Sequence, residues 1–121
     1  RSLEALLSRD PSITAFFVLD DDLAARVIIA LQRIRRRVPE DISIIAPGDV
    51  LDYSLPHIPQ ITTMRIDTAY MGKITGQMML NRITHNPQDI HVLKVKQQLV
   101  KRGSCRTVDH ALGREESFHI R

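Results

Sequence analysis

The sequence predicts an α/β fold built on a parallel β-sheet. The first observation is a continuous apolar run from Ile13 to Leu19, which has the length of a strand buried on both faces. The second is an amphipathic helix pattern that opens after this run and extends to about Arg36. The third is a helix stop at Pro39, followed by a second apolar strand from Ile42 to Ala46. A strand, a helix and a second strand in this order are typical of a parallel sheet, in which ligands gather at the carboxyl ends of the strands.

The elements of the first half follow from local patterns. Three leucines near the start predict the end of a helix, which Asp10-Pro11 breaks (Leu3, Leu6 and Leu7). In the first strand we expect Phe16, Phe17 and Val18 to be buried, because both faces of a parallel sheet are normally covered. The following helix has one apolar stripe at helical spacing (Ala24, Val27, Ile28, Leu31 and Ile34).

The second half predicts a third strand and a second long helix. Pro47 to Gln60 holds three prolines and one glycine, and is therefore expected to be a loop. Ile61 to Ile66 is a short strand, and a helix follows from Asp67 or Thr68 to about Thr84. Four apolar side chains of that helix are expected to point inward (Met71, Ile74, Met78 and Ile83), and Gly72 and Gly76 to allow close approach of another helix. His91 to Val95 and Gln97 to Lys101 are two further strand candidates, before a loose tail.

Composition excludes several classes of function. The chain has 121 residues and is 43% hydrophobic, enough for one domain with a core of ordinary size. Its formal charge of +3, from 17 basic and 14 acidic residues, is too weak and mixed to indicate nucleic-acid binding. No apolar run approaches the ~20 residues of a membrane span. The single cysteine, Cys105, fits a cytoplasmic location, and Arg1 in place of an initiator Met suggests a part of a longer protein.

No residue pattern indicates catalysis or a cofactor. The five histidines have no metal-ligand spacing (His57, His85, His91, His110 and His119), and Ser104 and Cys105 have no evident base partner. We therefore expect no enzyme activity, no metal and no cofactor.

The acidic turn Asp20-Asp21-Asp22 is the sharpest local signal, and it has two general interpretations. The carboxylates can simply cap the following helix, because they suit its free backbone amides and its positive dipole end. Alternatively, the acidic strand end is similar to that of a phosphorylatable receiver domain, where acidic residues hold Mg²⁺. That interpretation lacks a phosphoacceptor at the tip of the next strand, since Asp49 lies three residues beyond Ala46.

A third interpretation is a resemblance that runs through residues 5 to 106. Five motifs stand in collinear order: Asp20-Asp21, Val38 to Ile45, Pro59-Gln60-Ile61-Thr62-Thr63, Met71-Gly72, and the basic Arg102-Gly103-Ser104 ending. Together they resemble the effector-binding part of LacI/GalR-family transcription regulators. Two positions depart from the family pattern: Asp20 replaces an Asn, and Gly48 stands where the first residue of an Asp-Asp pair is expected, leaving only Asp49.

The resemblance implies a periplasmic-binding-protein-like α/β fold, truncated to part of the C-terminal subdomain plus a crossover helix. Residues 1–66 would belong to the C-terminal effector-binding subdomain and 67–88 to a crossover helix of the other subdomain. Residues 89–106 would be returning strands and 107–121 a loose tail. It also implies that Asp20, Asp21 and Asp49 contact the effector, as acceptors for ligand hydroxyls or ring nitrogens.

The function implied is non-catalytic: an effector-sensing and dimerising portion of a cytoplasmic transcription regulator. The expected partners are a small sugar-like or nucleoside-like effector and a second copy of the chain. DNA would be bound only through a helix-turn-helix head that this sequence does not contain, and no membrane contact is expected. A periplasmic sugar-binding protein of the same fold and the receiver domain are the alternatives. The predicted effector site requires that the turn after Leu19 and the loop near Pro47 open onto one crevice beside parallel strands.

Overall fold

The sheet has four strands in the order β1-β2-β3-β4, in a computed structural model that describes residues 3–85 and 92–107. The strands are β1 (Ala15–Phe17), β2 (Ser43–Gly48), β3 (Thr62–Arg65) and β4 (Gln98–Val100). The first three run parallel, while β4 pairs antiparallel with β3. The predicted α/β fold on a parallel sheet is therefore confirmed, with one antiparallel strand added at the edge.

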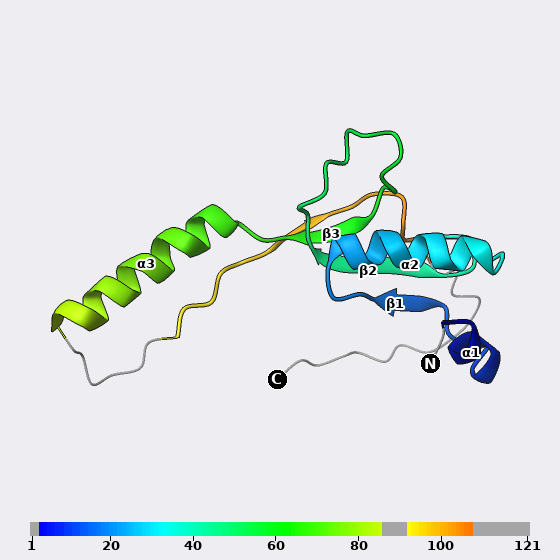
Figure 1. Ribbon diagram of the computed structural model, residues 1–121, viewed down its shortest axis with the longest axis horizontal. Coiled ribbons are helices and arrows are strands. Elements are labelled where there is room, and N and C mark those ends of the chain that lie inside the picture. The colour runs from blue at the N-terminus through cyan, green and yellow to red at the C-terminus, as the bar shows by residue number, and fades with distance from the viewer. Residues whose placement is uncertain (1–2, 86–91, 108–121) are drawn as a thin grey trace.

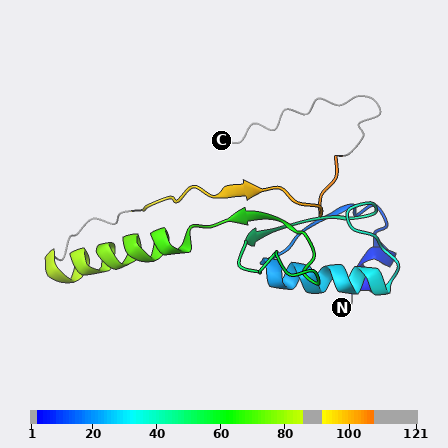
Figure 2. The same cartoon turned by 90° about the horizontal axis from the view of Figure 1, so that it is seen from above.

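Three helices accompany the sheet: α1 (Leu3–Arg9), α2 (Asp21–Arg33) and α3 (Thr68–His85). In Figure 1, α2 lies in front of β2 and runs along it, whereas α3 extends away from the sheet. Figure 2 gives the same arrangement from above, with α2 along one side of the sheet and α3 clear of it. Within the described ranges, no helix combines the length and the apolar character that crossing a membrane requires.

Helix α2 begins at its predicted N-cap and buries its predicted apolar stripe. The Asp20 carboxylate accepts a hydrogen bond of 2.7 Å from the backbone N–H of Leu23, the bonding pattern of an N-cap. The predicted apolar stripe is confirmed, since Ala24, Ile28 and Leu31 are buried. The helix ends at Arg33 rather than near Arg36, because Arg35 takes a left-handed backbone conformation with φ of 58°.

The core lies between α2 and one face of the sheet. Its fully buried members include Leu31 from α2, Ile44 from β2 and Ile61, which precedes β3. Ile44 and Ala46 alternate along β2 with partly buried side chains, so a single face of this strand packs against the helix.

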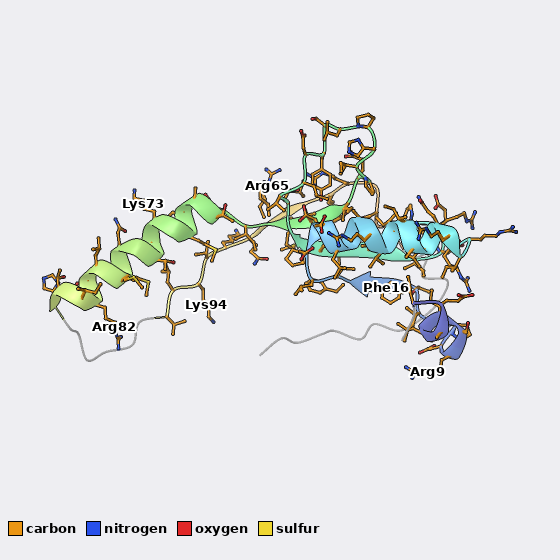
Figure 3. All side chains as sticks on the ribbon, viewed as in Figure 1. Arg9, Phe16, Arg65, Lys73, Arg82 and Lys94 are labelled. Carbon is orange, nitrogen blue, oxygen red and sulfur yellow. The ribbon has the colours of Figure 1, made fainter. Side chains whose placement is uncertain are left out.

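The expectation that Phe17 is buried is wrong. Phe16 pairs in register with Ile44 and packs against the core (Figure 3), whereas Phe17 pairs with Ile45 and its side chain is 72% exposed. Successive side chains of a strand point to opposite faces, and α2 covers only the face that carries Ile44. Among the described residues, β1 also forms the outer edge of the sheet, with β2 as its neighbour.

The inward packing expected for α3 is also wrong within the described part of the chain. None of its side chains is buried, and Met71, Met78 and Ile83 are 41%, 40% and 73% exposed. A Cβ added at Gly72 or Gly76 would meet no atom within 4 Å. An apolar helix pattern indicates which face can be covered, but burial requires a partner on that face.

The last strands are shorter than predicted. Residues 92–97 form no regular structure, so the candidate strand from His91 to Val95 is wrong for residues 92–95, and residue 91 lies outside the described residues. β4 covers only Gln98 to Val100 of the second candidate, because its pairing with β3 spans three residues. Beyond residue 107, the predicted tail lies outside the described residues. The domain boundaries expected from the sequence remain predictions.

Candidate functional site

The carboxyl ends of the parallel strands bring the predicted site residues to one edge of the sheet. Asp20 and Asp21 follow β1, Asp49 follows β2, and Arg65 is the last residue of β3. The turn after β1 and the loop after β2 touch directly, because the backbone N–H of Val50 lies 2.8 Å from the Asp21 carboxylate. The requirement that both turns open at the same end of parallel strands is therefore met.

Asp21 is fully buried, and it anchors the loop that follows β2. Its Oδ2 accepts hydrogen bonds from the backbone N–H groups of Val50 and Leu51, at 2.8 and 3.0 Å, and from the Tyr53 hydroxyl at 3.0 Å. Burial, and then the neighbouring Asp21 carboxylate, raise the pKa of the Tyr53 hydroxyl, which therefore remains a donor. The sequence predicts that Asp21→Ala weakens effector binding with the fold intact, but the structure shows that the same change also removes the loop's anchor.

Gly48 makes this burial possible. Its φ of +119° is rarely adopted by residues with a side chain, and a Cβ there would lie 2.8 Å from Oδ1 of Asp21. That oxygen is buried and has no hydrogen-bond partner in the part of the chain that the structure describes. In this chain a side chain at position 48 would therefore collide with the Asp21 carboxylate unless that carboxylate moved.

Asp49 is held by three side chains from the far side of the site. Its Oδ1 accepts from the Thr63 hydroxyl at 2.8 Å and pairs with Arg102 at 2.6 Å, and its Oδ2 pairs with Arg65 at 2.5 Å. Burial by itself would raise the pKa of Asp49, but the hydrogen bonds from these side chains outweigh it and lower the pKa. The carboxylate is only 4% exposed and stays charged near neutral pH.

Arg102 and Tyr53 complete the site, and sequence reasoning missed both roles. The Arg102 guanidinium stacks on the Tyr53 ring at 3.6 Å and also donates to the Ile61 carbonyl at 2.9 Å. In the sequence Arg102 stands out only as part of a basic ending, although a buried carboxylate at Asp49 requires a cation nearby. The loop composition contained no signal for Tyr53, because its neighbours come from distant parts of the chain.

Asp20 is the most available of the three predicted site residues. One oxygen caps α2 through Leu23, and its carboxylate lies at the same edge of the sheet as Asp49. Asp22 pairs with the exposed Arg26 at 2.7 Å, as a surface pair on the helix. The structure places Asp20, Asp21 and Asp49 together, and their contact with an effector remains a prediction.

The chemistry available at this edge is hydrogen bonding. In residues 3–85 and 92–107, no group of three or more His, Cys, Asp and Glu side chains could hold a metal ion.

Ser104 and Cys105 both donate to the Ile44 carbonyl, at 2.6 and 3.0 Å, and Ser104 also accepts from the backbone of Thr62 at 2.7 Å. Ser104 therefore joins the returning chain to β2 and β3.

Comparison with known proteins identifies the family. The chain matches the periplasmic binding protein-like domain over residues 1–105. The chain belongs to this family. The relatives described next confirm the predicted resemblance to the LacI/GalR regulators. The two alternatives, a receiver domain and a periplasmic sugar-binding protein, are not supported.

The relatives of this periplasmic binding protein-like chain are regulators. It is 31% identical to the HTH-type transcriptional repressor PurR of Pectobacterium atrosepticum and 33% identical to the HTH-type transcriptional regulator MalR of Clostridium butyricum. Both matches extend over 104 residues, 86% of this chain and 30% of the relative. A LacI family regulator from Arthrobacter sp. FB24, solved in complex with lactose, shares 29% identity and a TM-score of 0.67, over 84% of this chain and 38% of that one. The chain thus spans about 30% of the length of its curated relatives.

Proposed function

We propose that this chain is the effector-sensing and dimerising portion of a cytoplasmic, DNA-binding transcription regulator of the LacI/GalR type. The observation that carries the proposal is the match over residues 1–105, in which the acidic turn and the loop after β2 meet at one edge of parallel strands. Ligands of open α/β sheets gather at that edge. DNA would be bound by a separate helix-turn-helix head, as the names of the PurR and MalR relatives indicate for those proteins.

The effector proposed is a small sugar-like or nucleoside-like molecule. A related regulator is solved with lactose, which supports a hydroxyl-rich ligand. Asp49 receives three protein contacts, and Asp21 is fully buried although its Oδ1 has no partner among the described residues, so Asp20 is the carboxylate most able to accept from a ligand. We propose no catalytic step and no cofactor.

Dimerisation and the docking of the rest of the intact protein would use the apolar surfaces that this chain exposes. Tyr70, Met79, Leu80 and Ile83 of α3 are between 47% and 73% exposed. Exposed apolar surface of this extent on one helix is typical of a contact surface.

The test uses the intact regulator with lactose and cellobiose, which related regulators hold in solved complexes, and with adenosine and guanosine as nucleoside-like compounds. One of these compounds should raise the melting temperature by several degrees, since a ligand at about 100 times its Kd stabilises a protein by about 2.7 kcal/mol. The same compound should change affinity for promoter DNA in a mobility-shift assay.

The variant Asp20→Asn keeps a side chain that caps helices well while changing its charge, so it should alter effector affinity without altering thermal stability. Asp10→Asn, at the opposite end of β1, is the matched control and should leave affinity unchanged. A protein that binds no promoter DNA and responds to none of the compounds would contradict the proposal.

A further inference from the structure

The part of the chain between β3 and β4 extends from the sheet as an arm, described for residues 66–85 and 92–97. Figures 1 and 2 both show α3, its main element, standing clear of the strands. None of the side chains of α3 is buried. Where the arm leaves the sheet there is an open hollow of about 470 Å³, lined in part by Arg65, Asp67 and Lys96. In the described residues, the direction of the arm therefore depends on how its root is held rather than on packing along its length.

The Asp49 carboxylate holds both sides of that root. Arg65 is the last residue of β3 before the arm, at the junction of α3 and the sheet in Figure 3, and its guanidinium pairs with Oδ2 at 2.5 Å. Arg102 follows β4 on the returning side and pairs with Oδ1 at 2.6 Å. Thr63, which pairs in register with Val100 of β4, donates to the same Oδ1. One carboxylate thus joins the outgoing strand to the returning chain.

Asp49 also begins the loop that Asp21 anchors. The next two backbone N–H groups, from Val50 and Leu51, both donate to Asp21. On the other side, Arg102 stacks on Tyr53, whose hydroxyl donates to Asp21 as well. Asp49 itself has a φ of 87°, a conformation uncommon for residues other than glycine, which its contacts on both sides maintain. A continuous series of contacts therefore runs from the arm root to the acidic turn.

We propose that Asp49 is a positioning residue that couples the direction of the arm to the conformation of the loop at residues 49–53. The coupling itself does not depend on the proposed function, but its consequence does. In a regulator, an effector that reorders the loop would redirect the arm. The physical basis is that Arg65 and Arg102 converge on one carboxylate. Without its charge the two guanidinium groups repel each other, and the β3–β4 root can separate.

The coupling is tested by spin-label distance measurements on this chain without any effector. Labels are attached at the exposed positions of Arg33→Cys in α2 and Arg82→Cys in α3, in a chain that also carries Cys105→Ser. We expect Asp49→Asn roughly to double the width of the distance distribution, because the root then samples more positions. A second label pair, Glu4→Cys with Arg26→Cys, lies within the sheet unit and should be unaffected.

Two matched variants separate positioning from a general loss of stability. Asp52→Asn removes a carboxylate of the same loop that, among the described residues, bonds only to Ser54, and this change should leave the distribution unchanged. Asp49→Glu restores the charge and should narrow the distribution relative to Asp49→Asn. The proposal is overturned if Asp49→Asn lowers the melting temperature but leaves the distribution unchanged, or if Asp52→Asn broadens it equally.

If the Asp49→Asn chain does not fold, Arg65→Gln takes its place, since that side chain is half exposed and its loss leaves Asp49 paired with Arg102. This variant releases the outgoing strand from Asp49 without creating repulsion, so a smaller broadening supports the proposal and an unchanged width overturns it. Because no effector is present, failure of this test leaves the proposed function untouched. Conversely, an intact regulator that binds no sugar or nucleoside would leave these distances unchanged.

Discussion

Replacing Gly48 by Ala tests whether the buried Asp21 carboxylate excludes every side chain at position 48. The new methyl carbon would lie 2.8 Å from Oδ1 of Asp21, closer than real Cβ contacts come, and φ at this position is +119°. The carboxylate cannot simply rotate away, because its other oxygen accepts three hydrogen bonds. The variant must therefore strain its backbone, move Asp21, or both.

The cost can be worked out from these two effects. A residue with a side chain in a rare backbone conformation costs about 1–3 kcal/mol, and loss of a hydrogen bond to a charged group costs about 1.5–3 kcal/mol. Together they predict a loss of roughly 2.5–6 kcal/mol in the free energy of unfolding. For a domain of this size, this lowers the melting temperature by about 10 °C or more.

Urea and thermal unfolding, followed by circular dichroism, measure this loss. Gly72→Ala is the matched control, because that glycine lies inside α3 with no atom within 4 Å of an added Cβ, and the change should stabilise by up to about 1 kcal/mol. The double variant with Asp21→Ala removes the oxygen that collides, so its loss should be smaller than the sum of the two single losses. A Gly48→Ala chain as stable as the original, or losses that add to within about 0.5 kcal/mol, would refute the reasoning.

Two further predictions concern other carboxylates of the site. Asp20→Ala should lose about 1 kcal/mol of stability in chemical unfolding, while Asp20→Asn should lose little, and equal losses would contradict the capping role. Because the pKa of Asp49 is lowered in the folded state, its contribution to stability is present above the ordinary value of 3.8 and is lost as the pH falls through the folded pKa. Urea midpoints measured from pH 7 to pH 3 should therefore fall less steeply for Asp49→Asn, although part of the fall remains because the pKa of Asp41 is also lowered by Arg37. Identical pH profiles for both chains would contradict this prediction.

The sequence by itself determined the elements whose signals are local. The apolar stripe of α2, its cap at Asp20 and the alternation of two short strands with a helix are read from spacing alone, and parallel pairing follows from the short strands and the helix between them. The collinear motifs also identified the family. They predicted that Asp20, Asp21 and Asp49 lie at one edge of the sheet.

Only the tertiary structure decided what those carboxylates contact. Asp21 is buried by a loop some thirty residues away, and Asp49 is neutralised by Arg65 and Arg102, which no local pattern connects with it. The exposure of Phe17 and of α3 likewise depends on whether another element covers them. The physical reason is the same in each case: spacing along the chain sets which face of an element is apolar, whereas burial and charge pairing depend on neighbours that only the fold brings close.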